Sequence, residues 1–171
     1  MDESQIKIIL NKLGQGLPPQ SRLVLIGGGA LTLLGNHRTT IDIDFLGDDI
    51  DPSDLDKAIM QFAEKQKILM EPVPLHRFIP IPEGSDDRTI QVGQFGNMEV
   101  FVADPYSIAI SKLDRGFDTD IDDIFFLINN NFIEISLLVK MVNVALVNAR
   151  EYDLNSNDIL SRIKKIQTRL S

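Results

Sequence analysis

The chain has 171 residues, of which 43% are apolar and 25% are charged, as is usual for a globular protein. Its net charge of −8 argues against a broad non-specific DNA-binding surface, which needs clustered Lys and Arg. Cysteine is absent and only two histidines occur, which excludes disulfides and disfavours a zinc site. No apolar run approaches the ~18–20 residues of a membrane span. The acidic N-terminus lacks the features of a signal peptide, so we expect a cytoplasmic protein without a membrane partner.

The first part of the chain predicts a mixture of helices and strands. In chain order we expect a helix at residues 3–13, a strand at 23–26, a short helix at 30–34, a strand at 41–46, a helix that begins after the Ser53 cap, and strands at 75–82, 89–95 and 98–103. The pair Gly96-Asn97 indicates a tight turn between the last two strands.

From Asp104 onward the pattern is helical, and Asp104 with Pro105 is typical of a cap and a first turn. Helices are expected at residues 105–114, 120–130, 133–149 and 156–170. This order predicts an α+β fold in which a small mixed sheet flanked by helices is followed by a helical C-terminal part. We expect residues 1–104 to form the α/β core and residues 105–171 to form a helical subdomain packed on it.

Two aspartates interrupt the apolar strand. Because side chains alternate along a strand, Asp42 and Asp44 share one face about 6–7 Å apart. Ile41, Ile43 and Phe45 are expected to point the other way, into the core. Neighbouring carboxylates repel each other, and a divalent cation such as Mg²⁺ removes that conflict. The alternative is a solvated edge strand, which is the commoner explanation for this pattern taken alone.

Gly27, Gly28 and Gly29 stand between a strand and a helix, where backbone N–H groups can receive a phosphate without obstruction by side chains. Taken alone, these glycines indicate only a tight turn. Together with the aspartates, within one strand–helix–strand unit, they favour a site for phosphate and metal. Arg38 and Thr40 lie in the connecting loop, where Arg38 could neutralise phosphate charge or form a surface ion pair.

The stretch GGGALTLLGNHRTTIDID resembles the signature of the nucleotidyltransferase-fold superfamily, the polymerase-beta-like enzymes. Gly27 and Gly28 match the glycine pair of that signature, and Asp42 and Asp44 match its carboxylate pair. The fuller pattern is similar to small bacterial nucleotidyltransferases, which include uncharacterised proteins and toxin components of toxin–antitoxin systems. The residues of that fuller pattern are Ala30, Gly35, Arg38 and Thr40. The similarity covers about residues 20–130.

The resemblance implies further site residues. Members usually have a third carboxylate on a later strand, for which Glu99 is the candidate; the alternative is an exposed residue beside a turn. Asp104 is another acid, for which a helix cap is the better explanation. Lys112 is expected to reach the phosphates of the substrate. Relatives usually have an arginine where Thr119 stands, so no arginine role is predicted there.

The implied function is transfer of a nucleoside monophosphate from a nucleoside triphosphate (NTP) to an acceptor hydroxyl, with Mg²⁺ or Mn²⁺ as cofactor. Asp42, Asp44 and Glu99 would bind the metal and serve catalysis. The nucleotide would be bound by Gly27, Gly28, Gly29, Arg38, Thr40 and Lys112. The acceptor could be a tRNA, a protein or a small molecule, and an antitoxin protein could be a partner. The alternative is a catalytically degenerate fold that binds a nucleotide or a partner protein.

Overall fold

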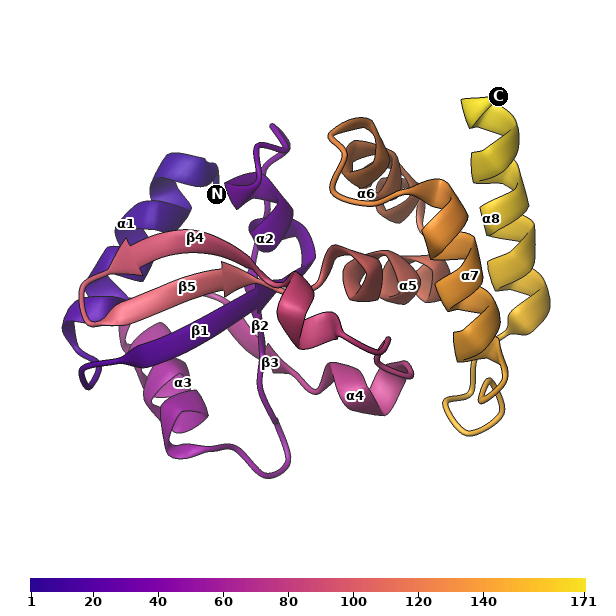
Figure 1. Ribbon diagram of the computed structural model, residues 1–171. Coiled ribbons are helices and arrows are strands. Elements are labelled where there is room, and N and C mark those ends of the chain that lie inside the picture. Colours follow the sequence, from indigo (N-terminus) through magenta and orange to yellow (C-terminus); the bar gives the residue numbers. More distant parts are fainter. The chain divides into compact units, whose positions relative to one another are not determined.

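The computed structural model describes residues 1–171 and contains a five-stranded sheet and eight α-helices (Figure 1). The chain divides into two compact units. The first consists of Met1–Pro74 and Thr89–Ala103, and the second of Leu75–Arg88 and Asp104–Ser171. Residues 75–88, which the sequence analysis placed in the N-terminal part, therefore group with the helices of the second unit. No helix combines the length and the apolar character that crossing a membrane requires.

The sheet of the first unit has the strand order β3-β2-β1-β5-β4. Its strands are β1 (Ser21–Ile26), β2 (Ile43–Leu46), β3 (Met70–Val73), β4 (Ile90–Phe95) and β5 (Met98–Val102). The pairs β1–β2 and β4–β5 are antiparallel, whereas β1–β5 and β2–β3 are parallel. The sheet is therefore mixed, as expected, and its central strand β1 lies beside β2, which carries Asp44 and begins directly after Asp42.

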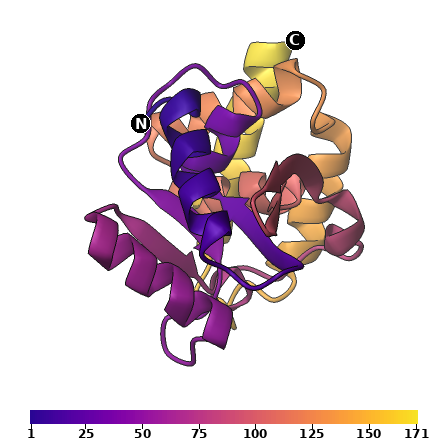
Figure 2. The same cartoon turned by 90° about the vertical axis from the view of Figure 1, so that its left-hand side faces the viewer.

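One face of the sheet forms the core of the first unit. Alternate strand residues are fully buried on this face, among them Leu25, Ile43, Phe45, Val100 and Val102. Two amphipathic helices, α1 (Glu3–Gln15) and α3 (Asp54–Gln66), add buried side chains to the unit. In Figure 2 both helices stand in front of the strands. Each begins with a capping box, which satisfies the N–H groups of its first turn and so fixes where the helix starts.

Two strand expectations are wrong. Residues 75–82 do not form a strand: the chain makes the short helix α4 (Leu75–Phe78), and Pro80 and Pro82 have no N–H for a strand ladder. The strand that carries Asp44 begins at Ile43 rather than at Ile41. Because the backbone bends at Ile41, its side chain is 82% exposed instead of lying in the core.

The second unit contains four longer helices that agree closely with the expected ranges. These are α5 (Pro105–Arg115), α6 (Asp118–Asn129), α7 (Ile135–Leu146) and α8 (Ser156–Leu170). Asp104 caps α5 as expected, because its Oδ1 accepts a hydrogen bond from the backbone N–H of Tyr106. Arg88, from the 3-10 helix η1 (Ser85–Arg88), donates two hydrogen bonds to the same carboxylate at 2.9 and 2.8 Å. This pairing fastens residues 85–88 to the start of α5.

Candidate functional site

Three carboxylates meet on β2 and β3 of the first unit. Asp42, Asp44 and Glu71 each offer one oxygen, and these oxygens all lie within 4.8 Å of one another. Asp44 and Glu71 are register partners on the two neighbouring strands, and Asp42 immediately precedes β2. The structure thus brings the two expected aspartates together and adds a third acid beside them. We refer to these three residues as the carboxylate group.

Glu71 is not among the residues that the sequence predicts for this site, where Glu99 is the expected third acid. Glu99 lies on β5 opposite Arg22 of β1, four residues before Ile26, which is the register partner of Asp44. Four strand residues span about 13 Å, so Glu99 stands toward the other end of the sheet and outside the carboxylate group. A signal for Glu71 was present: it is the only charged residue in the apolar run ILMEPVPL.

The glycine turn lies directly against the carboxylate group. Gly27 begins the helix α2 (Gly27–Leu33) with a φ of +76°, in the left-handed region that favours glycine. A Cβ at this position would lie 2.5 Å from Oδ2 of Asp44. At Gly28 a Cβ would lie 2.9 Å from Nη2 of Arg38 and 3.2 Å from Oγ1 of Thr40. Because these two residues lack side chains, the carboxylate of Asp44, the guanidinium of Arg38 and the hydroxyl of Thr40 can all lie against the same turn.

Two buried threonines order the loop that follows α2. Oγ1 of Thr32 lies 3.0 Å from the carbonyl oxygen of Gly28 and 3.2 Å from that of Arg38. Oγ1 of Thr40 lies 3.1 Å from the carbonyl oxygen of Asp42 and 3.3 Å from its Oδ1. The backbone N–H of Thr40 also donates to the carbonyl oxygen of Met1. Arg38, Thr40 and Asp42 are thus placed by local hydrogen bonds.

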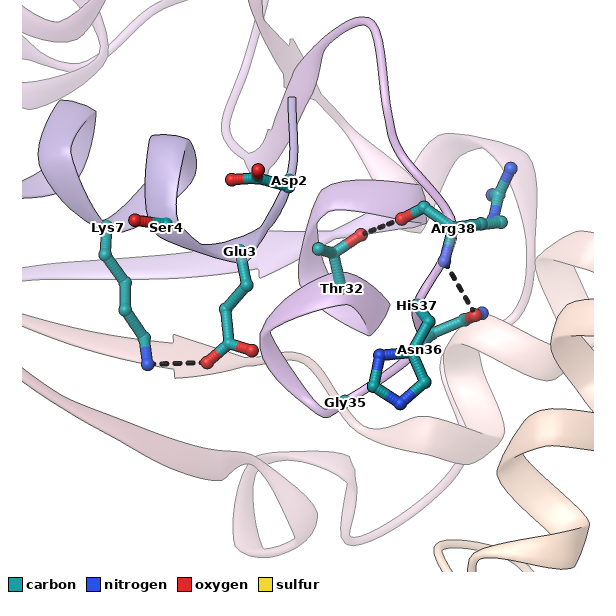
Figure 3. Close-up of a pocket in the computed structure, with 9 residues that line it drawn as sticks. All are labelled: Asp2, Glu3, Ser4, Lys7, Thr32, Gly35, Asn36, His37 and Arg38. Carbon is teal, nitrogen blue, oxygen red and sulfur yellow. Dashed lines mark hydrogen bonds and ion pairs between the residues drawn. The ribbon is translucent and has the colours of Figure 1, made fainter.

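A polar cavity of about 390 Å³ lies beside the same loop (Figure 3). It is lined by Asp2, Glu3, Ser4, Lys7, Thr32, Gly35, Asn36, His37 and Arg38. Within it the ammonium of Lys7 pairs with Glu3 at 2.6 Å, and the bond from Thr32 to the carbonyl of Arg38 lies at its edge. The cavity has the volume of a site for a small polar molecule, and the loop that borders it also carries Thr40 and Asp42.

Lys112, expected to contact phosphate, is 2% exposed on α5 in the second unit. Its Nζ lies 3.1 Å from Oδ1 of Asp120 and 2.7 Å from Oδ2 of Asp123, and Arg115 also pairs with Asp120. Burial raises the pKa of Asp120, but Arg115 and Lys112 outweigh this effect, so the pKa is below its usual value. We call these four residues the Lys112 cluster. Its geometry favours a structural role for Lys112.

Comparison with known proteins gives one family match. A family model described as a nucleotidyltransferase of unknown function (DUF6036) matches residues 5–169. No curated protein and no solved structure matches the chain. The matched range includes the carboxylate group, the glycine turn and the helices of the second unit up to one residue before the end of α8, so the match spans both units.

Proposed function

The chain belongs to the nucleotidyltransferase family DUF6036, and we propose that it moves a nucleoside monophosphate from an NTP to an acceptor hydroxyl at the carboxylate group. The α+β structure, with its mixed sheet and helical C-terminal part, is that of a nucleotidyltransferase fold. The observation that carries the proposal is the meeting of Asp42, Asp44 and Glu71 within 4.8 Å, beside a glycine turn.

The donor set of the carboxylate group fits a divalent cation. Carboxylate oxygens are the hard ligands that Mg²⁺ and Mn²⁺ prefer, and three carboxylates this close repel one another. Asp42, Asp44 and Glu71 would hold the ion. When bound, the metal would neutralise negative charge on the triphosphate and on the reacting phosphoryl group.

Residues around the glycine turn would bind and orient the nucleotide. The guanidinium of Arg38 lies beside Gly28, where it would contact phosphate oxygens and fix the register of the triphosphate. The missing side chains of Gly27 and Gly28 leave room for Asp44 and Arg38 to lie against the turn. Glu71 is the exposed member of the carboxylate group, so we assign it the role of general base, which accepts the proton of the attacking hydroxyl.

The reaction balances without a further reactant. The acceptor oxygen forms a bond to the α-phosphorus, and the bond from that phosphorus to the bridging oxygen of the β-phosphate breaks. Pyrophosphate leaves with the electron pair, and the hydroxyl proton passes to a carboxylate and then to solvent. A tRNA, a protein and a small molecule each offer a suitable hydroxyl, so the test has to supply all three classes.

The proposal is tested by incubating the protein with each NTP, labelled on the α-phosphate, together with Mg²⁺, total RNA and cell extract. We expect label on one acceptor class, and no label from an NTP that is labelled on the γ-phosphate. Asp42→Asn and Asp44→Asn should each reduce transfer by about 10²–10³-fold or more, because charge stabilisation at the phosphoryl group is lost. Asp51→Asn, an exposed acid outside the carboxylate group, is the matched control.

Two outcomes would contradict the proposal. Transfer that survives both aspartate substitutions would place the chemistry elsewhere. Nucleotide binding without transfer from any NTP to any acceptor would support the degenerate binding module instead.

A further inference from the structure

Thr40 is buried, and its hydroxyl faces Asp42. The residue is 8% exposed, and Oγ1 lies 3.1 Å from the carbonyl oxygen and 3.3 Å from Oδ1 of Asp42. A hydroxyl has one hydrogen, so these two acceptors share it. The methyl Cγ2 lies 3.7 Å from the position that a Cβ of Gly29 would take. The side chain is therefore fixed between the first turn of α2 and the aspartate.

The backbone on both sides of this side chain is also held. The N–H of Thr40 donates to the carbonyl of Met1 at 3.0 Å, and the ammonium of Met1 donates to the carbonyl of Thr40. Because the donor is fixed at its main chain and its side chain, a bond to Asp42 constrains the carboxylate more than a mobile donor would.

We propose that Thr40 is a positioning residue, which orients the carboxylate of Asp42 to receive a divalent cation. This inference rests on the proposed function. Carboxylates that bind metals are themselves usually held by a second shell of hydrogen bonds, and losing such a bond weakens metal binding. The nucleotide contact that the resemblance implies for Thr40 would need the same single hydrogen, which Asp42 already receives.

The chain offers a matched control. Thr32 is also buried, at 3% exposure, and stands in the same contact between α2 and its following loop, but its hydroxyl meets only main-chain oxygens. Thr32→Val and Thr40→Val therefore remove the same group from similar surroundings. Only Thr40→Val removes a donor to the carboxylate of Asp42. Thr40→Ser keeps that donor, and Thr40→Ala supplies a second variant without it.

The test measures Mn²⁺ binding in the absence of nucleotide, and the electron paramagnetic resonance signal of the free ion reports how much remains unbound. We expect Thr40→Val and Thr40→Ala to raise the Kd about 10-fold, at the low end of second-shell effects. Thr40→Ser and Thr32→Val should stay within about 2-fold of wild type, because both keep the bond to Asp42. Asp42→Asn should bind far more weakly. Thermal unfolding in EDTA tests whether both valine variants lose stability to a similar degree.

Failure of this inference is distinct from failure of the proposed function. If wild type binds Mn²⁺ and Asp42→Asn does not, while both variants of Thr40 that lack the hydroxyl bind like wild type, Thr40 does not position the carboxylate. The same holds if Thr32→Val weakens binding as much as Thr40→Val. A raised KM for NTP that saturating Mn²⁺ does not restore would make Thr40 a nucleotide contact. If Asp42→Asn binds Mn²⁺ like wild type, the metal site of the proposed function is itself wrong.

Discussion

Acidic side chains gather at two places in this protein, in opposite ways. In the second unit, the acids of the Lys112 cluster are fully buried and converge on basic side chains. In the first unit, the members of the carboxylate group converge on one another, and they are half-buried or exposed. A buried carboxylate is costly unless a cation and hydrogen bonds accompany it. In the second unit the accompanying cations are the side chains of Lys112 and Arg115.

The difference suggests how to separate structural from functional acids. The Lys112 cluster joins α5 to α6. Its lysine and both its aspartates are buried, Arg115 is exposed, and the two basic and two acidic side chains balance within the fold. The carboxylate group concentrates negative charge where a cation from solution can reach it. Neutralising an acid should therefore damage stability in the second unit and damage metal binding in the first. The following substitutions test that contrast.

The largest effect is expected for Lys112→Met. The substitution leaves Asp120 and Asp123 buried around an apolar side chain, which should lower the free energy of unfolding by about 3–5 kcal/mol. Urea unfolding followed by circular dichroism measures this loss. Lys164→Met, at an exposed position of α8, is the control and should change little. If Lys112→Met keeps its stability but binds NTP weakly, Lys112 contacts the substrate phosphates, and the Lys112 cluster is not a purely structural counterpart of the carboxylate group.

Asp120→Asn should cost about 2 kcal/mol near neutral pH, because hydrogen bonds to a charged partner are weakened. The pKa of Asp120 is lower in the folded state than its unfolded value of about 4. Its contribution is therefore complete above about pH 4 and is lost as the pH falls through the folded pKa. The unfolding free energies of wild type and variant should therefore differ by a constant amount from pH 7 to about pH 4 and should converge only below it. Asp122→Asn, an exposed neighbour, should run parallel to wild type.

Local patterns predicted much of the fold and two of the three members of the carboxylate group. Strict alternation in IDIDF placed Asp42 and Asp44 on one face, and turn residues marked most element boundaries. The strand that carries Glu71 is not predicted, because Pro72 follows Glu71 and proline is unfavourable in most strands. Proline is tolerated here because β3 lies at the edge of the sheet. The pairing of β2 with β3 joins residues about 27 positions apart in sequence, and only the fold brings them together.

The role of Lys112 depends in the same way on tertiary structure. The sequence shows a lysine on a helix and, eight positions later, an aspartate at the start of another. Whether that ammonium reaches a substrate or an internal carboxylate is decided by how α5 and α6 pack, which periodicity does not specify. The hydrogen bond from Thr40 to Asp42 is different, because a threonine and an aspartate two positions apart can bond within one turn.

Glu71→Gln and Glu99→Gln test which acid completes the proposed metal site. Glu71→Gln removes a direct carboxylate ligand. It should weaken Mn²⁺ binding by more than the about 10-fold expected for the outer-shell bond of Thr40, a loss above about 1.4 kcal/mol. Glu99→Gln should bind like wild type, because Glu99 stands opposite Arg22 and outside the carboxylate group. Isothermal titration with Mn²⁺ measures both constants. If Glu99→Gln weakens Mn²⁺ binding and Glu71→Gln does not, the third metal ligand is Glu99 and not Glu71.

The smallest expected effect is a change in stability whose direction separates the two acidic regions. In EDTA, Glu71→Gln should raise the unfolding free energy by about 0.5 kcal/mol, because like charges on register partners repel and Asp44 lies directly opposite. Added Mg²⁺ should remove this advantage, since an ion that binds only the folded state stabilises the wild type more than the variant. Asp120→Asn, the analogous acid-to-amide change in the second unit, should instead destabilise with or without Mg²⁺. If Glu71→Gln also destabilises in EDTA, Glu71 is a structural acid like Asp120, and the separation between the two acidic regions is lost.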